Sequence, residues 1–244
     1  CGGRPLGESH DPYVGFESTL PLFSEQTTAE GRVILETSPS KLAYFNPQQF
    51  SKQKPAGTFR IFCLGGSTTY GRPYDDRTSF PGWLRELLPV VDDRHSWEVI
   101  NAGGISYASY RVVTVMQELA EFEPDLFIVY SAHNEFLEDR TYRAVRNTPP
   151  ALRRTTSLLA RTRTATLMHS WYHGDRDRES RHILPGEVDE TLNHTVGPTA
   201  YQRNDLLREQ VLRHFRFNLQ RMLNIASDCG AKIVLVGPSA NIKD

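Results

Sequence analysis

The sequence is poor in cysteine, has no long apolar run, and carries almost no net charge. Its 244 residues include three cysteines, Cys1, Cys63 and Cys229. An odd count at this spacing does not form a disulfide framework, and Cys63 and Cys229 suit the role of small buried hydrophobes. No apolar stretch reaches the ~20 residues that span a bilayer. A membrane anchor is therefore expected only upstream of Cys1 or as a lipid attached to it.

The start of the sequence leaves two interpretations open. Cys1, followed by two glycines, suits the lipidated first residue of a mature bacterial lipoprotein. The interpretation that we favour is a sequence that begins in the middle of a gene.

The net charge of the whole chain does not indicate nucleic-acid binding. Lysine and arginine number 28 and the acidic residues 29, which gives a formal net charge of -1. A chain of this length buries a single core without metal or disulfide staples. We therefore predict one α/β domain with an insertion, and neither a cofactor nor a metal.

Apolar periodicity predicts four strands that alternate with helices. The strands are expected at residues 59–64, 97–100, 126–130 and 232–236, and the helices at 79–88, 110–122 and 205–226. Strands apolar on both faces and separated by helices predict a three-layer α/β/α sandwich around a parallel sheet.

Two regions lack this pattern. Residues 1–57 are predicted to form an arm packed on the main domain (58–244) through the apolar-aromatic segments 13–16 and 42–45. A mainly helical insertion is expected at about 137–201. Seven arginines between residues 140 and 163 occur there without an intervening acid. They suit a basic lid that attracts anionic substrates such as acidic polysaccharide or lipid headgroups, or a solvated helical face. A nucleic-acid role would need aromatic residues among them, and only Tyr142 qualifies.

The first predicted strand ends in the segment Gly65-Gly66-Ser67. Two glycines allow a tight turn, and the serine then lies at the carboxyl edge of the sheet, where parallel-sheet proteins bind ligands. A plain turn is the alternative. A nucleotide P-loop is excluded because Arg72 and Pro73 stand where that motif needs lysine and Ser/Thr.

Two further segments follow the next two strands. The glycine-rich loop 101–106 brings backbone N–H groups toward a bound acyl oxygen, or simply joins strand to helix. Asn134, in the polar loop 131–135, suits an oxyanion donor or the cap of a following helix. The three segments are more specific together than alone, because each follows a strand and all are expected at one edge.

With these segments the chain resembles the SGNH/GDSL family of serine esterases and lipases, in a flavodoxin-like fold. Segments 59–74, 101–111 and 125–136 look like a bacterial lipolytic-protein subgroup. The resemblance implies that Ser67 is the nucleophile and that its backbone N–H, that of Ser106, and the Asn134 amide form the oxyanion hole. Ser106 and Ala132 stand where the family usually has glycine, and Thr68 where leucine is commoner.

The family's closing Asp-x-x-His motif has no counterpart in the expected place. The one such spacing, Asp92 to His95, precedes the second strand and is interpreted as a chance match at the far edge. Truncation before the motif is the simplest explanation, and the chain as it stands is predicted to be inactive or nearly so. Six further histidines are poor candidates for the catalytic base: His133, His169, His173, His182, His194 and His214.

The leading functional hypothesis is a carboxylic-ester hydrolase acting on a small-molecule or glycan ester. An O-acyltransferase acting on a glycan uses the same residues, and a non-catalytic binding module would keep the fold without the base. Because the family is often exported, the resemblance favours the cell envelope or secretion over the cytoplasm. Acyl-chain length and oligomeric state stay open.

Overall fold

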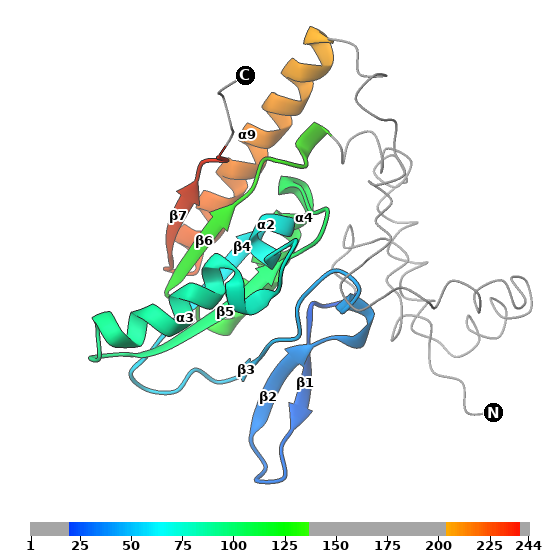
Figure 1. Cartoon of the computed structure of the whole chain (residues 1–244). Coiled ribbons are helices and arrows are strands. Elements are labelled where there is room, and N and C mark those ends of the chain that lie inside the picture. The colour runs from blue at the N-terminus through cyan, green and yellow to red at the C-terminus, as the bar shows by residue number, and fades with distance from the viewer. Residues whose placement is uncertain (1–19, 137–203, 240–244) are drawn as a thin grey trace, which may run out of the picture.

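The computed structural model describes residues 20–136 and 204–239 (Figure 1). The predicted segment 13–16, the insertion at 137–201 and the last five residues lie outside the described part of the chain. Among the described residues, no helix combines the length and the apolar character needed to cross a membrane.

A four-stranded sheet forms the centre of the molecule. Its strands stand in the order β5-β4-β6-β7, and every neighbouring pair is parallel. The strands are β4 (Thr58–Gly65), β5 (Ser96–Gly103), β6 (Leu126–Tyr130) and β7 (Lys232–Val236). The predicted parallel sheet is confirmed, and β5 extends three residues beyond its predicted end.

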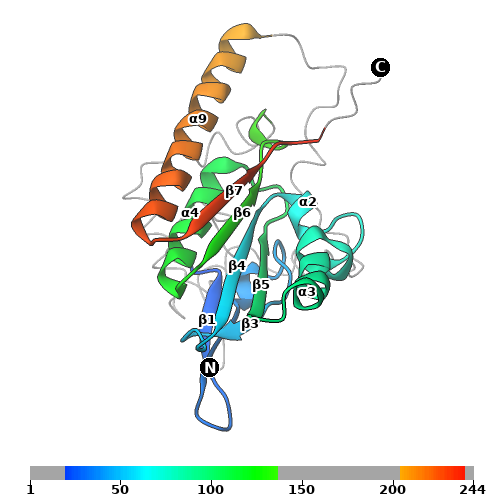
Figure 2. The same ribbon diagram turned by 90° about the vertical axis from the view of Figure 1, so that its left-hand side faces the viewer.

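Helices cover both faces of this sheet (Figure 2). Helix α3 (Phe80–Val91) packs on β5 on one side, while α4 (Ser109–Leu119) and α9 (Asp205–Asp228) pack together on the other. Single turns occur at α2 (Ser67–Tyr70), η1 (Pro39–Lys41), η2 (Asp76–Thr78) and η3 (Ala120–Phe122). The α/β fold with helix layers on both faces of the parallel sheet is confirmed.

Alternate side chains of β4 fill the two halves of the core. Phe62 and Leu64 belong to the cluster that packs with α4 and α9, whereas Ile61 and Cys63 belong to the cluster beneath α3. Side chains of a strand alternate between faces, so a strand covered on both faces must be apolar throughout. This is why the strand appears in the sequence as one compact apolar run.

Ser79 forms the N-cap of α3. The Ser79 hydroxyl accepts a hydrogen bond from the Gly82 N–H at 3.1 Å, and proline occupies the first turn. Serine in this position satisfies a backbone donor that has no partner within the helix.

Residues 20–57 contain a second sheet that the sequence analysis did not predict. Three antiparallel strands run in the order β1-β2-β3: β1 (Phe23–Thr27), β2 (Val33–Thr37) and β3 (Gln49–Ser51). Each is at most five residues long and only partly buried, too short for a clear alternating pattern.

Hydrogen bonds and packing contacts anchor this segment to the main domain at several places. Glu118 of α4 accepts hydrogen bonds from the Leu22 and Phe23 N–H groups at 2.9 and 3.1 Å. Phe45 is 1% exposed, and its ring centroid lies 4.9 Å from that of Tyr107. The division of the chain into arm and main domain stays a prediction.

Candidate active site at the carboxyl edge of the sheet

Three strands end level with one another at one edge of the sheet. Gly65 of β4 is the register partner of Gly103 in β5 and of Tyr130 in β6. The loops that follow these strands therefore leave the same edge at the same height, and they are the three loops that the sequence analysis singled out.

The turn after β4 needs glycine at both of its first positions. A Cβ on Gly65 would lie 2.1 Å from the Tyr130 carbonyl oxygen, and the backbone there has a φ of +157°. A Cβ on Gly66 would lie 2.8 Å from the Asn134 side-chain nitrogen and 3.2 Å from the Tyr107 oxygen. The chain thus passes between two neighbouring loops with room for hydrogen atoms only.

Ser67 follows this crossing as the first residue of α2 and is half-buried. Its carbonyl oxygen accepts hydrogen bonds from the Gly71 and Arg72 N–H groups, each at 3.0 Å. The end of α2 is also fixed, because the side chains of Asn46 and Asn101 both donate hydrogen bonds to the Tyr70 carbonyl oxygen, at 2.8 and 3.2 Å. Ser67 therefore stands on a fixed backbone.

The loop after β5 carries Ser106 in an unusual conformation. Its φ is +64°, in the left-handed region that glycine adopts at no steric cost, and the residue is 2% exposed. Its carbonyl oxygen accepts a hydrogen bond from the Arg111 guanidinium. The backbone angle explains why glycine is the usual residue of the resembled family here.

In the loop after β6, Ala132 likewise has a positive φ, +130°, at a position where the resembled family usually has glycine. Two residues later, the side-chain nitrogen of Asn134 donates a hydrogen bond to the Tyr107 carbonyl oxygen at 3.0 Å. This contact joins the third loop directly to the residue after Ser106.

The structure thus brings together the surroundings of all three residues expected from the sequence. Asn134 touches the residue before Ser67 and the residue after Ser106. The catalytic roles assigned to Ser67, Ser106 and Asn134 stay predictions.

An Asp–His pair does form, between Asp92 and His95, with 3.5 Å between the Oδ2 and Nδ1 atoms. It precedes β5 and therefore lies at the amino edge, opposite the three loops, as the sequence analysis expected. His214 of α9 stacks on Tyr110 at a centroid distance of 5.9 Å. His133 is exposed, and its ring meets the Tyr130 ring edge-on at 5.3 Å.

Tyr70, at the end of α2, is a poor candidate for the missing base. Burial raises the pKa of its phenol above the ordinary range, and the nearby Arg72 guanidinium only partly offsets this effect. A phenol that stays protonated donates a hydrogen bond but does not accept a proton at neutral pH.

A buried polar group that was not predicted from the sequence lies behind these loops. Glu135 is 8% exposed and Arg111 is fully buried, and both contact the segment 106–109. Two signals point to them in the sequence: Glu135 directly follows Asn134, and Arg111 interrupts the apolar face of the helix that begins at Ser109.

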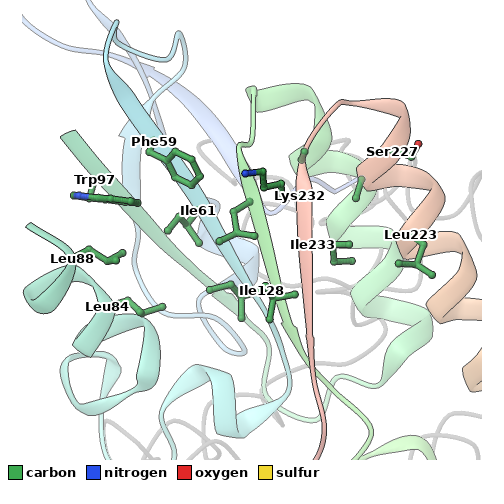
Figure 3. Close-up of a pocket in the computed structure, with 14 residues that line it drawn as sticks. Phe59, Ile61, Leu84, Leu88, Trp97, Ile128, Leu223, Ser227, Lys232 and Ile233 are labelled. Atoms are coloured by element: carbon green, nitrogen blue, oxygen red, sulfur yellow. The ribbon is translucent and has the colours of Figure 1, made fainter. Parts of the chain in front are cut away.

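An apolar groove of about 810 Å³ lies elsewhere, near the amino ends of the strands (Figure 3). Its lining comes from β4, β5, β6, β7 and the helices α3 and α9, and it is apolar except for Ser227 and Lys232. None of the lining residues belongs to the three loops, so this groove is separate from the candidate site. Within residues 20–136 and 204–239, no group of three or more potential metal ligands forms.

The chain matches no family model and no curated protein. Among solved structures it is similar to AlinE4, an SGNH-hydrolase family esterase, with 17% identity over 74% of this chain and 77% of that chain and a TM-score of 0.32. Two mutants of this esterase, one aspartate-to-alanine and one serine-to-alanine, align over the same shares with 19% and 17% identity and a TM-score of 0.31 each. Similarity at this level concerns the fold and says nothing about the chemistry of Ser67.

Proposed function

We propose that this protein is a carboxylic-ester hydrolase that forms an acyl-enzyme on Ser67. The observation that carries the proposal is the close approach of the Asn134 amide to Gly66, 2.8 Å from the position of an added Cβ. A nucleophilic hydroxyl with an amide donor beside it is the arrangement that acyl transfer from an ester requires.

The Asn134 amide has a donor to spare for this role. A primary amide carries two N–H groups, and one of them is engaged by the Tyr107 oxygen. The second N–H supports the negative charge that develops on the ester oxygen when Ser67 attacks. The Tyr107 contact fixes the amide before the substrate arrives, so no reorganisation is needed in the transition state.

The reaction then needs a proton acceptor. The Ser67 oxygen bonds to the acyl carbon and its proton passes to a base, which returns it to the departing alcohol. A water molecule then attacks the acyl carbon while the base takes its proton, and the base passes this proton to the Ser67 oxygen as the carboxylic acid leaves. Histidine is the usual base, and it is expected outside the described residues.

The same residues support an O-acyltransferase, in which a glycan hydroxyl takes the place of water. A binding module that has the loops but no base is the non-catalytic alternative. Incubating full-length protein with an acyl donor and candidate glycans distinguishes the transferase from the hydrolase, because acylated glycan forms only with a transferase.

The direct test uses full-length protein and a short p-nitrophenyl ester. We expect turnover that Ser67→Ala removes and that Thr68→Ala, a change in the exposed neighbouring hydroxyl, leaves in place. A fluorophosphonate should add its mass to the peptide that contains Ser67. Undiminished hydrolysis by Ser67→Ala overturns the proposal, and absence of turnover together with absence of labelling favours the binding module.

A further inference from the structure

A buried carboxylate stands directly behind the candidate oxyanion loops. Glu135 follows Asn134 in the chain, and its residue is 8% exposed. Its two oxygens accept hydrogen bonds from Ser109, one from the backbone N–H and one from the hydroxyl, each at 2.8 Å. A carboxylate that is buried and bound through both oxygens is a costly feature, so a specific role is expected of it.

The hydroxyl of Ser109 extends this contact to helix α9. Asn218 is fully buried, and its side-chain nitrogen lies 2.9 Å from the Ser109 oxygen. The Asn218 nitrogen donates to the Ser109 oxygen, and the Ser109 hydroxyl in turn donates to Glu135. Both Glu135 oxygens thus act as acceptors.

A second buried charge holds the other end of the same segment. The Arg111 guanidinium donates to the Ser106 oxygen and lies 4.2 Å from the centre of the Tyr107 ring. Residues 106–109 are thus held by side chains at Ser106, at Tyr107 and at Ser109.

Two of these contacts come from consecutive residues of the third loop. Asn134 binds the Tyr107 oxygen, and Glu135 binds Ser109, two residues further along. Two bonds from adjacent residues restrict rotation as well as distance, whereas the Asn134 contact alone would allow the loop to pivot.

We propose that Glu135 is a positioning residue, which through Ser109 keeps the Asn134 amide aimed at the space beside Ser67. The proposal rests on the proposed function, in which that amide supports the ester oxygen. Because this support is needed only in the transition state, loss of Glu135 should lower kcat and leave KM nearly unchanged. A merely structural role would lower stability and leave the kcat of the folded protein as it was.

The kinetic test uses full-length Glu135→Ala, Glu135→Gln and Ser109→Ala with a p-nitrophenyl ester. We expect Glu135→Ala to lower kcat about 10- to 100-fold, as small displacements of catalytic groups do. Glu135→Gln should recover part of the loss, because its amide oxygen still accepts from the Ser109 N–H. Ser109→Ala, which removes the hydroxyl contacts alone, should lie between them.

Glu118→Gln is the matched control. Glu118 is also a largely buried carboxylate that accepts two backbone hydrogen bonds, but its partners are Leu22 and Phe23 rather than the candidate loops. We expect this variant to lower the melting temperature without changing kcat. A fall in kcat equal to that of Glu135→Ala would overturn the proposal.

A second measurement is independent of turnover. In ¹⁵N–¹H spectra of full-length protein, the Asn134 side-chain amide should exchange slowly with water because it is bonded to Tyr107, and Glu135→Ala should accelerate this exchange. If the unsubstituted protein shows no Ser67-dependent hydrolysis, the proposed function fails, and the exchange rate still tests the positioning. Unchanged exchange in folded Glu135→Ala overturns the inference. If that variant does not fold, unchanged exchange in Ser109→Ala, which removes the hydroxyl contacts, overturns it in the same way.

Discussion

The side-chain nitrogen of Asn134 lies 2.8 Å from the place where a Cβ on Gly66 would stand. Gly66 has a negative φ of -92°, which any residue adopts, so backbone conformation does not demand glycine here. Space demands it. The absent side chain is what lets the loop after β6 approach the residue before Ser67.

Gly66→Ala tests this relationship. The new methyl group must displace the Asn134 amide or the Tyr107 carbonyl, and loss of one oxyanion donor typically lowers kcat about 100- to 1000-fold. We expect a loss of that order for ester hydrolysis by full-length protein, measured as initial rates. Gly237→Ala is the control, because nothing lies within 4 Å of an added Cβ there. Equal rates for both variants would contradict the geometry.

Arg60→Met should unfold at distinctly lower urea concentration than the unsubstituted protein. The guanidinium of Arg60 is fully buried and donates to Glu98 at 2.5 Å, to the Phe122 oxygen at 2.6 Å and to the Ser51 oxygen at 2.7 Å. Methionine fills the volume but leaves these acceptors without a partner, which costs about 2–3 kcal/mol.

The comparison for Arg60 is Arg94→Met. Arg94 also forms an ion pair, with 2.8 Å between its Nε and the Asp92 Oδ1, but its side chain is 79% exposed. Exposed pairs contribute little to stability, so no measurable change in the urea midpoint is expected. A larger loss for Arg94→Met than for Arg60→Met would show that burial does not decide the outcome.

Glu118 should make the stability of the protein depend on pH. Burial raises the pKa of its carboxyl, and the nearby Glu121 adds to this, while the Leu22 and Phe23 N–H groups and Lys41 act in the opposite direction. Above the unfolded value of about 4.3, the folded state therefore binds more protons than the unfolded one, and stability falls as pH rises toward the folded pKa.

Glu118→Gln cannot titrate and lacks this fall. The destabilisation that it causes should therefore be larger at about pH 4 than at about pH 7, as measured by urea unfolding at the two values. A difference that is constant or that grows with pH would mean that burial does not raise the pKa of this carboxyl.

Cys63 should resist alkylation in the folded protein. Burial raises the pKa of its thiol to about 12, so the reactive thiolate is scarce, and the side chain is 0% exposed. With iodoacetamide at about pH 8, peptide mass analysis should find Cys63 modified only after denaturation, whereas the half-buried Cys229 reacts sooner. Rapid native labelling of Cys63 would indicate that the β4 core opens readily.

Much of the central sheet was predictable because its signals are local. The strands at 126–130 and 232–236 agree with their predicted bounds to the residue, since a run that is almost entirely apolar needs only its own composition to be recognised. The cap at Ser79 is likewise decided within four residues. The edge at which the three loops gather follows from the general rule for parallel sheets.

The strands β1, β2 and β3 were not predictable in this way. Their side chains are a mixture of polar and apolar, and their hydrogen bonds join residues brought together by turns and by packing on α4. Short, partly buried strands take their stability from neighbours, so composition alone does not distinguish them from a loop.

The sequence by itself determined the order of strands and helices around the central sheet, the edge of that sheet at which the three loops begin, and the identity of Ser67 and Asn134 as candidates. The tertiary structure alone decided that Gly66 makes room for Asn134 and that Glu135 binds Ser109, 26 residues away. Periodicity reports which face of an element is buried. It does not report which distant side chain occupies the opposite side of that interface, because the contact depends on the relative placement of whole elements.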